Sequence, residues 1–341
     1  MSHTAEDLRK LQAKSLEDKI QISFARIVEW YEHWDGKVYV SFSGGKDSTV
    51  LLDLVRSIYP EVPAVFFDTG LEFPELREFV LNTPNVRILK PKMSFVEVIK
   101  THGYPVITKR ISDTVKYANP GTARWNLLHG TARLDNGKSS WFNCEKWAYL
   151  LDADFKIGSE CCNVMKKNPA KHFQVESGMH PFLGVMTDES IARRNNWLHN
   201  GCNGFNTKYP TSTPLAFWTE QDILKYIASR NLKIASVYGE VKEKDDIYYT
   251  TLEERTGCVF CAYGAHREKE PNRFQQLAVT HPKLYDYCMR GGKYDENGRW
   301  IPDKGLGMAK VLDYIGVKWW NTDEEHDKYC NFPPNPKQRE E

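Results

Sequence analysis

Apolar residues in the first hundred positions follow two different spacings along the chain. One is helical, with an apolar residue at every third or fourth position, and it covers residues 4–33, 48–59, 74–82 and 94–103. The other is a short apolar run of strand length, found at residues 38–42 and 62–67. A third strand is expected over residues 86–91 (VRILKP). Buried parallel strands are apolar on both faces, because helices cover the sheet from both sides. The alternation therefore predicts an α/β fold: a mostly parallel open sheet with helices on both faces.

Cap residues locate several of the expected helix ends. Pro74 suits the first turn of a helix, where its missing N–H costs nothing. Ser94 is a favourable N-cap, and Gly103 is a favourable stop for the same helix. Thr219 and Asp222 have the spacing of a capping box, which predicts a further helix over residues 219–231.

The strand–helix rhythm breaks between residues 113 and 160. This segment holds three tryptophans, and its Asn136-Gly137 pair is typical of a β-hairpin turn. We expect an insertion there, after which the apolar run 182–186 resumes the sheet. From about residue 265 the spacing is helical, and the Pro-rich, charged tail 331–341 is expected to be disordered or to lie on the surface.

Composition narrows the class of protein. Hydrophobic residues make up 41% of the 341 residues and charged residues 27%, which excludes a disordered or fibrous chain. Lys and Arg number 46 against 45 Asp and Glu, so no overall positive field attracts nucleic acid or an anionic membrane. The N-terminus is charged throughout, and no apolar run is long enough to cross a bilayer. We therefore expect a soluble, cytoplasmic protein with no membrane partner.

A glycine turn between the first strand and its helix is the first candidate site. Two glycines allow the backbone to turn tightly and to approach a ligand closely. The turn directs backbone N–H groups and a helix N-terminus at one point, which favours an anion. A lysine and several hydroxyls add charge and donors, although a ligand-free tight turn is the alternative. The candidate residues are Ser41, Phe42, Ser43, Gly44, Gly45, Lys46, Asp47, Ser48 and Thr49.

Four of the eight cysteines form the second candidate site. Without a secretory signal they are not expected to form disulfides, and clustered reduced thiols more often bind metal. Four soft ligands suit zinc or an iron–sulfur cluster, and plain buried thiols remain a further alternative. Adjacent cysteines suit a zinc site poorly, because such sites usually use two C-x-x-C hairpins. The four are Cys161, Cys162, Cys258 and Cys261.

The segment SFSGGKDSTVLL resembles the PP-loop of the adenine-nucleotide α-hydrolase-like superfamily. Within that superfamily the chain is most similar to the phosphoadenosine phosphosulfate reductase family, whose second motif appears here as Asp68-Thr69-Gly70 followed by Phe73-Pro74-Glu75. The resemblance implies an adenine nucleotide in the crevice at the carboxyl ends of the strands. It covers about residues 35–265. We therefore expect an N-terminal helical segment (1–34), a PP-loop nucleotide-binding domain (35–265, with an insertion near 113–160) and a C-terminal helical extension with its tail (266–341).

The same resemblance extends to two further segments. The cysteine spacing, with Lys166 and Pro169 after the pair, is similar to the paired-cysteine [4Fe-4S] site of adenylyl-sulfate reductases, and implies that cofactor. Gly184, Arg193 and Arg194 lie in a segment similar to one whose arginines contact phosphate or sulfate. Met186 stands where that segment has its first arginine, so the arginine contact carries over only to Arg193 or Arg194. A solvated helix face is the alternative for this pair.

Two departures from the reductase pattern favour another reaction. Reductases of the family attack with a cysteine in a C-terminal E-C-G-L/I-H motif, whereas Cys330 here stands in DKYCNF. Their PP-loop is usually degraded, whereas SGGKDS is intact here, which favours ATP with Mg²⁺. The leading hypothesis is an ATP pyrophosphatase that yields AMP and pyrophosphate and adenylates an acceptor in sulfur transfer, with Lys46 and Asp47 catalytic.

Other interpretations stay open at this stage. A phosphosulfate reductase that forms sulfite is the second hypothesis, and a nucleotide-sensing or cluster-sensing regulatory module is the third. The acceptor is not determined by the sequence, and a nucleic acid brought by a partner protein is one candidate. A homodimer is one possible assembly state. Cys202 is either a persulfide-carrying nucleophile or a buried structural thiol.

Overall fold

The computed structural model describes residues 3–333 and 335. The chain forms two compact units, each built from two separate segments. Unit 1 comprises residues 1–91 and 166–258, and unit 2 comprises residues 92–165 and 259–341. These boundaries differ from those of the expected three-part division, which stays a prediction. Most of the expected tail lies outside the described residues.

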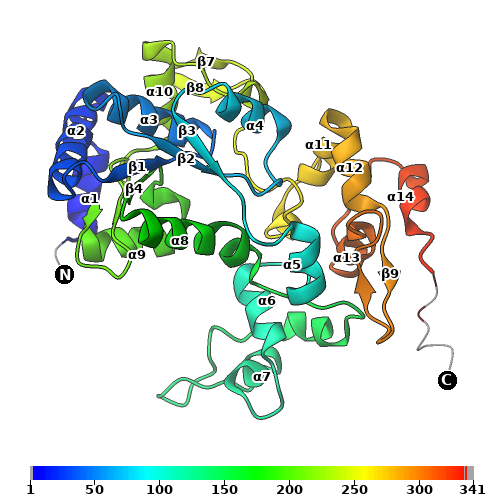
Figure 1. Ribbon diagram of the computed structural model, residues 1–341. Helices are drawn as coiled ribbons and strands as arrows, with labels where there is room; N and C mark the ends of the chain where they lie inside the picture. The colour runs from blue at the N-terminus through cyan, green and yellow to red at the C-terminus, as the bar shows by residue number, and fades with distance from the viewer. Residues whose placement is uncertain (1–2, 334, 336–341) are drawn as a thin grey trace. The chain divides into compact units, whose positions relative to one another are not determined.

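Unit 1 contains the main sheet and the helices that cover it (Figure 1). Its helices are α1 (Ala5–Gln12), α2 (Leu16–His33), α3 (Lys46–Ile58), α4 (Pro74–Leu81), α8 (Asn168–Ser177), α9 (Ile191–Asn200) and α10 (Glu220–Arg230). Its strands are β1 (Val38–Ser41), β2 (Ala64–Phe67), β3 (Val86–Leu89), β4 (His180–Leu183), β5 (Asn203–Gly204), β6 (Thr211–Ser212), β7 (Val241–Lys244) and β8 (Ile247–Thr250).

The six-stranded sheet has the order β3-β2-β1-β4-β6-β5. All neighbours are parallel except β5 and β6, which confirms the expected mostly parallel α/β fold. The chain builds outward from β1 through β2 to β3, and then returns to place β4 on the other side of β1. The strand order therefore reverses between β1 and β4. In open α/β sheets, this switch point is where ligands bind, beyond the carboxyl ends of the strands.

The two faces of the sheet bury alternate residues of each strand. Val38 and Val40 of β1 pack into the large core that also contains apolar residues of α2, α3 and α10. Tyr39 points to the other face, where it meets Phe173 of α8. Because side chains of a strand alternate between faces, one strand that is apolar at every position needs helices on both sides. The structure confirms that prediction for β1.

Unit 2 is mainly helical. Its helices are α5 (Phe95–His102), α6 (Lys109–Lys116), α7 (Ala123–Leu128), α11 (Arg273–Thr280), α12 (Pro282–Met289), α13 (Met308–Tyr314) and α14 (Asp323–Cys330). A small hairpin of β9 (Lys293–Tyr294) and β10 (Trp300–Ile301) interrupts the C-terminal helices, which the sequence did not predict. The expected hairpin at Asn136-Gly137 is a tight turn closed by a single antiparallel bridge, Arg133 to Ser139.

Short irregular helices connect several of these elements. The 3₁₀ helices are η1 (Glu145–Asp152), η3 (Thr187–Glu189), η4 (Ser236–Tyr238) and η5 (Ala265–Arg267), and η2 (Asn163–Lys167) is a π-helical turn. π turns are rare and are frequent at functional sites. Here the π turn begins directly after the Cys161-Cys162 pair.

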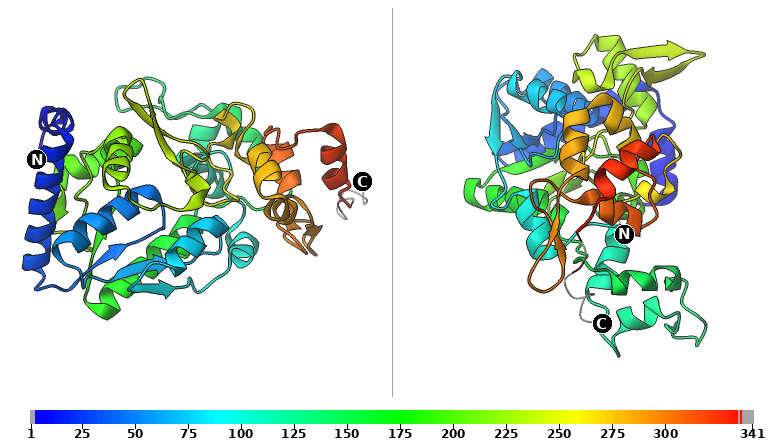
Figure 2. Two further views of the ribbon diagram at one scale, coloured as in Figure 1. Left: turned by 90° about the horizontal axis from the view of Figure 1, so that it is seen from above. Right: turned by 90° about the vertical axis from the view of Figure 1, so that its right-hand side faces the viewer.

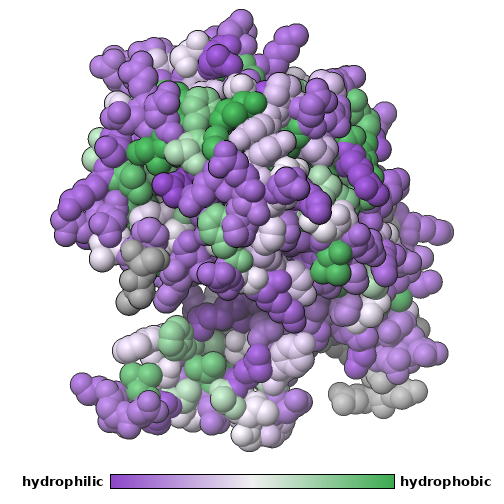
Figure 3. Space-filling view, turned by 60° about the vertical axis from the view of Figure 1, so that its left-hand side comes forward, coloured by the Kyte–Doolittle hydropathy of each residue, from purple (hydrophilic) through white to green (hydrophobic). Residues whose placement is uncertain are grey.

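The surface is mostly hydrophilic on the face seen in Figure 3, with apolar residues in small scattered groups. Trp141 and Phe142 in the insertion are two of the exposed large apolar side chains, at 76% and 52% exposure. Among the described residues, none of the helices has the length and apolar character needed to span a membrane.

Candidate functional site

The glycine turn lies at the switch point of the sheet. β1 ends at Ser41, α3 begins at Lys46, and Gly45 is the N-cap residue of α3. Gly44 has a φ of 75°, in the left-handed region that favours glycine. A Cβ atom on Gly44 would lie 2.8 Å from Cγ2 of Val80 and 3.0 Å from the carbonyl oxygen of Leu76. Both the conformation and the close approach of α4 therefore require glycine at this position.

Hydroxyl groups satisfy the polar backbone of the turn. The N–H of Ser43 donates to Oγ of Ser48 (3.2 Å), and the N–H of Gly45 donates to Oγ of Ser43 (3.3 Å). Ser48 and Thr49 in turn donate to the carbonyl oxygen of Gly45, at 2.9 and 3.0 Å. Both hydroxyl groups thus lie at the N-terminal end of α3, as an anion-binding turn requires.

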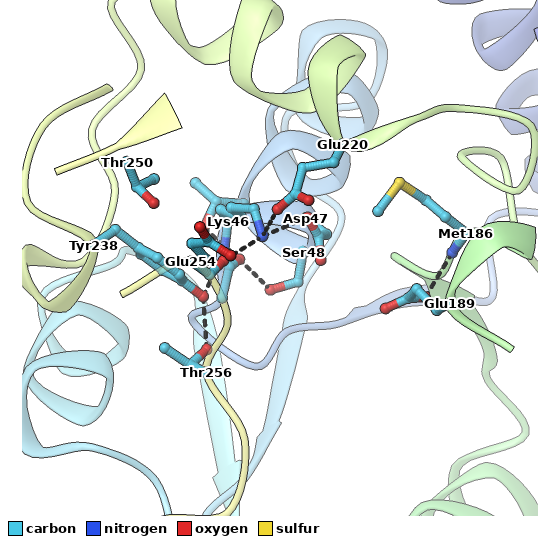
Figure 4. Close-up of polar contacts among 12 residues, drawn as sticks. Lys46, Asp47, Ser48, Met186, Glu189, Glu220, Tyr238, Thr250, Glu254 and Thr256 are labelled. Carbon is cyan, nitrogen blue, oxygen red and sulfur yellow. Dashed lines mark hydrogen bonds and ion pairs between the residues drawn. The ribbon is translucent and has the colours of Figure 1, made fainter. Parts of the chain in front are cut away.

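Lys46 is 4% exposed and is surrounded by oxygen atoms (Figure 4). Its Nζ donates to the carbonyl oxygen of Glu254 (2.9 Å) and lies 3.2 Å from Oε1 of Glu220. Its backbone N–H donates to the hydroxyl of Tyr238 (3.3 Å), which is 2.6 Å from Oγ1 of Thr256. The segment 254–256 after β8 therefore closes over the beginning of α3.

Asp47 is a partly buried carboxylate beside that ammonium group, with its side chain 24% exposed. Its Oδ1 lies 3.8 Å from Nζ of Lys46 and accepts no hydrogen bond from the described residues. Burial raises the pKa of Asp47, and the negative charge of Glu220 adds to the rise, while Lys46, Arg255 and Arg193 act against it. Burial also lowers the pKa of Arg193. The site therefore brings charges of both signs together, partly shielded from water.

The expected Arg193–Arg194 pair divides between two environments. Arg193 forms an ion pair with Glu189 and interacts electrostatically with Asp47, so α9 directs it toward the glycine turn. Arg194 lies on the exposed part of the same helix. Gly184 follows β4, and a Cβ atom there would lie 3.1 Å from the carbonyl oxygen of Asp47. The loop after β4 thus touches the first turn of α3.

Asp68, Thr69 and Gly70 follow β2, the neighbour of β1. Asp68 is 6% exposed, accepts from the N–H of Gly70 (3.2 Å) and pairs with Nε of Arg77 (3.1 Å). The hydroxyl of Thr69 donates to Glu72 (2.7 Å). Because β2, β1 and β4 are adjacent and parallel, the loops that follow them share one edge of the sheet. The structure brings the three predicted motifs to that edge.

The residues that surround Lys46 from the second half of the chain stand in no recognisable motif. These are Glu220, Tyr238, Glu254 and Thr256. The capping box at Thr219 predicted the start of α10, whose first residue is Glu220. It gave no information about the residues that α10 contacts, so the proximity of Glu220 to Lys46 was not predicted. The hairpin of β7 and β8, which precedes Glu254, packs on α10 (Figure 2) and has no motif that would reveal its role.

Three of the four predicted metal-binding cysteines lie close together in unit 2. Sγ of Cys161 and Sγ of Cys162 are 3.9 Å apart. The pKa of Tyr263 is raised, mainly by burial and further by the negative charges of Cys161, Cys162 and Cys261, so the three thiols lie near this side chain. Cys258 is the last residue of unit 1. It precedes Cys261 by three positions, so the two Cα atoms are at most about 11 Å apart even if the chain between them is extended.

Basic residues near the cysteines have other partners as well. Lys166 forms an ion pair with Glu72, with Nζ 3.5 Å from Oε1. Arg273 pairs with Glu268, and its Nη1 also donates to the carbonyl oxygen of Cys261 (3.1 Å). Arg273, on α11, is thus a positive charge beside one predicted ligand that sequence analysis did not single out.

Two further thiols have raised pKa values. Burial raises the pKa of Cys202 to about 11, and Nε1 of Trp197 donates to its sulfur (3.4 Å). This environment favours the buried structural thiol over the nucleophile. Burial, with a hydrogen bond to Asp313, raises the pKa of Cys330 to about 12.

Comparison with known proteins gives consistent results. The family model described as "Phosphoadenosine phosphosulfate reductase domain" matches residues 37–107 and 111–263. An uncharacterized protein of Methanocaldococcus jannaschii is 32% identical over 90% of this chain, and the match covers 61% of that relative's length. An adenosine 5'-phosphosulfate reductase of Staphylococcus haemolyticus is 25% identical over 69% of this chain and 74% of its own.

A solved structure adds a weaker likeness. The phosphoadenylyl-sulfate reductase of Candida auris, crystallised as a phosphate complex, is 16% identical. The alignment covers 71% of this chain and 97% of that one, with a TM-score of 0.36.

Proposed function

The chain belongs to the phosphoadenosine phosphosulfate reductase family, and from this premise we propose that it transfers the adenylate group of Mg-ATP to an acceptor and releases pyrophosphate. AMP is released when the adenylated acceptor reacts further. The observation that carries the proposal is the turn of Gly44 between β1 and α3 at the switch point of the sheet. A left-handed glycine turn at a helix N-terminus is an anion site. Its position beside the loop of Asp68-Thr69-Gly70 fits the triphosphate and the adenosine of one nucleotide.

The turn supplies the donors that the leaving pyrophosphate needs. The N–H groups of Ser43, Gly45 and Lys46 donate to hydroxyl oxygens, which phosphate oxygens can replace. An acceptor oxygen attacks the α-phosphorus, the bond to the bridging oxygen breaks, and pyrophosphate leaves with the electron pair. The ammonium of Lys46 and the dipole of α3 offset the negative charge that develops on that leaving group.

Asp47 is the residue that we assign to Mg²⁺. Its Oδ1 is buried and accepts no hydrogen bond from the described residues, and carboxylate oxygens are preferred magnesium ligands. The raised pKa of Asp47 reflects a charge that burial disfavours, and a divalent cation would restore the charged form. When bound, the ion would supply Lewis-acid stabilisation of the phosphates.

The cysteines fit a [4Fe-4S] cluster. Three thiols lie near Tyr263, and the fourth, Cys258, is three residues from Cys261 in the sequence. Four thiolates are the ligand set of such a cluster, and Arg273 places a positive charge beside Cys261. The cluster would supply an electron-transfer or sulfur-handling centre.

The proposal is tested by anaerobic calorimetric titration of cluster-loaded protein with Mg-ATP and, in parallel, with phosphoadenosine phosphosulfate. We expect a clear preference for Mg-ATP. Pyrophosphate release should fall by about 100-fold or more in Lys46→Ala, the scale of losing one stabilising donor of transition-state charge. Lys10→Ala, at an exposed position of α1, is the matched control. Preference for the phosphosulfate would overturn the proposal.

A second candidate is reduction of a phosphosulfate to sulfite. This candidate is favoured because relatives from Staphylococcus haemolyticus and Bacillus subtilis are named adenosine 5'-phosphosulfate reductases. Cys330→Ser separates the two candidates. In the ATP reaction this variant keeps pyrophosphate release, whereas in a reductase that uses Cys330 it loses sulfite formation with the cluster intact.

A further inference from the structure

Three metal-binding side chains of different types meet at the C-terminal end of unit 2. Sγ of Cys330 lies 3.2 Å from Nε2 of His326 and 3.2 Å from Oδ2 of Asp313. Nε2 of His326 is also 3.2 Å from the same Oδ2. The three atoms thus form a nearly equilateral triangle. His326 and Cys330 are one helical turn apart on α14, and Asp313 comes from α13.

The size of this triangle matches one face of a zinc tetrahedron. Zinc bonds nitrogen and oxygen at about 2.0–2.2 Å and thiolate sulfur at about 2.3 Å, so neighbouring ligand atoms lie roughly 3.3–3.7 Å apart. The observed separations of 3.2 Å are close to that range. An ion at bonding distance from all three atoms would lie about 1 Å above their plane and would keep its fourth position open.

The same geometry argues against a catalytic relay of cysteine, histidine and aspartate. In such a relay the carboxylate holds one ring nitrogen while the other nitrogen activates the nucleophile. Here Asp313 and Cys330 both meet Nε2 of His326. One nitrogen cannot serve both partners of a relay, whereas three ligands that converge on one point are what a metal ion requires.

Neighbouring groups hold the ligands in this arrangement. Nε1 of Trp319 donates to Oδ1 of Asp313 (2.7 Å), which leaves Oδ2 directed at the triangle. Oδ1 of Asp327 lies 3.8 Å from Nδ1 of His326, which is the ring nitrogen that does not take part in the triangle. Trp320 packs against the imidazole, with ring centroids 4.1 Å apart. The hydrogen bond from Trp319 is of the kind that orients a ligand and raises metal affinity.

We propose that Asp313, His326 and Cys330 form a zinc site that fastens α14 to α13. Helix α14 has no buried residue, and its first turn carries three acidic residues. Tyr329 contacts Asp286 through its hydroxyl (2.9 Å), but an eight-residue helix without a buried apolar face gains little from burial. A bound ion would supply the missing stabilisation, because ligands brought together by folding bind metal at the expense of the unfolded state. The site is separate from the proposed nucleotide reaction and does not depend on it.

The test measures zinc in the full-length protein by elemental analysis and by zinc-edge X-ray absorption. We expect about one equivalent of zinc with one sulfur and otherwise nitrogen or oxygen ligands. Cys330→Ser, His326→Ala and Asp313→Asn should each lose that equivalent, while Cys144→Ser and Asp323→Asn should keep it. A chelator should lower the melting temperature of the parent protein and of both controls.

The design separates this site from the four cysteines of the proposed cluster. Zinc bound there would show four sulfur ligands and would survive Cys330→Ser. Trp319→Phe keeps all three ligands and should weaken zinc binding about 10-fold, the usual effect of losing an orienting hydrogen bond. A parent protein without zinc, or one whose zinc is unchanged in all three ligand variants, would overturn the proposal.

Discussion

At the scale of single residues, the candidate site holds groups that oppose folding. Asp47 is ionised at neutral pH only at a cost, because burial withdraws its carboxylate from water. Nζ of Lys46 lies 3.8 Å away and compensates in part, while Glu220 works in the opposite direction. Strained or destabilised groups of this kind persist where function needs them.

We predict that Asp47→Asn makes the protein more stable at pH 7 and slows pyrophosphate release. A carboxyl whose pKa is raised by folding binds its proton more tightly in the folded state, so its contribution to stability falls as pH rises through the folded pKa. The amide removes that penalty. The stabilisation should therefore shrink as pH falls toward about 4, the ordinary pKa of an aspartate.

Urea unfolding followed by circular dichroism across this pH range checks the prediction. Asp245→Asn, in the exposed turn of the β7–β8 hairpin, is the matched control and should leave stability unchanged. A variant at position 47 that is less stable than the parent at pH 7 would show that the carboxylate stabilises the fold.

Individual site residues were predictable from the sequence where they stand close together along the chain. Gly44 and Lys46 were identified because glycines, a lysine and hydroxyls stand together in one turn. Glu254 was missed because its contribution to Lys46 is a backbone carbonyl oxygen, which every residue has. Its proximity comes from tertiary folding across 208 positions, and no local pattern records that.

At the scale of elements, the glycine turn depends on two separate requirements. Gly44 needs a left-handed backbone, and α4 leaves no room for a side chain. We predict that Gly44→Ala destabilises unit 1 by about 2–3 kcal/mol, combining about 1 kcal/mol of backbone strain with the cost of displacing Val80.

Gly178→Ala isolates the first requirement. Gly178 ends α8 in the same left-handed region, with a φ of 66°, and nothing lies within 4 Å of an added Cβ atom. It should cost only about 1 kcal/mol. Equal losses in the two variants, measured as shifts in the urea midpoint, would mean that the contact with α4 relaxes at no cost.

Asp222, in the capping box of α10, also forms a tertiary contact with α2. Asp222 accepts from the N–H of Thr219 (2.7 Å) and also pairs with Nζ of Lys19 (2.6 Å), which lies on α2 and is 2% exposed. Asp222→Asn should cost about 3 kcal/mol, because it leaves a buried ammonium without its counter-charge. Glu6→Gln breaks an exposed pair with Lys10 and should cost less than about 0.5 kcal/mol. Thermal unfolding of both variants checks the contrast.

Helices and strands were predictable from the sequence when they were long enough for their apolar residues to show a regular spacing. The apolar runs and caps located β1 to β4 and, in unit 1, helices α1 to α4 and α10, because burial imposes a period on four or more residues. Helices α8 and α9 were not located in this way. Strands β5, β6, β9 and β10 have two residues each, which is too short for any alternation. The insertion likewise forms short helices whose packing, rather than periodicity, determines their place.

At the scale of the whole molecule, the chain separates two kinds of chemistry. The glycine turn and all the described partners of Lys46 belong to unit 1, whereas the Asp313–His326–Cys330 triangle belongs to unit 2. We predict that Mg-ATP slows hydrogen exchange in residues 42–49 and leaves α14 unchanged, while a zinc chelator accelerates exchange in α14 and leaves residues 42–49 unchanged.

Exchange measured by mass spectrometry on the intact protein resolves both regions at once. If the two sites are energetically independent, their effects on stability add. A chelator that also loosened residues 42–49 would contradict this independence and would indicate coupling between the two units.

The position of β4 has a consequence for synthesis. β1 is the centre of the sheet, but its neighbour on one side, residues 180–183, is translated well after residues 38–41. While the ribosome makes the intervening segment, the nascent β3-β2-β1 half-sheet presents β1, with its buried residues Val38 to Val40, as an open edge. Such an edge can pair with another chain. The half-finished polypeptide is therefore the form in which this protein most needs a chaperone, and slower elongation before codon 184 would increase its tendency to aggregate.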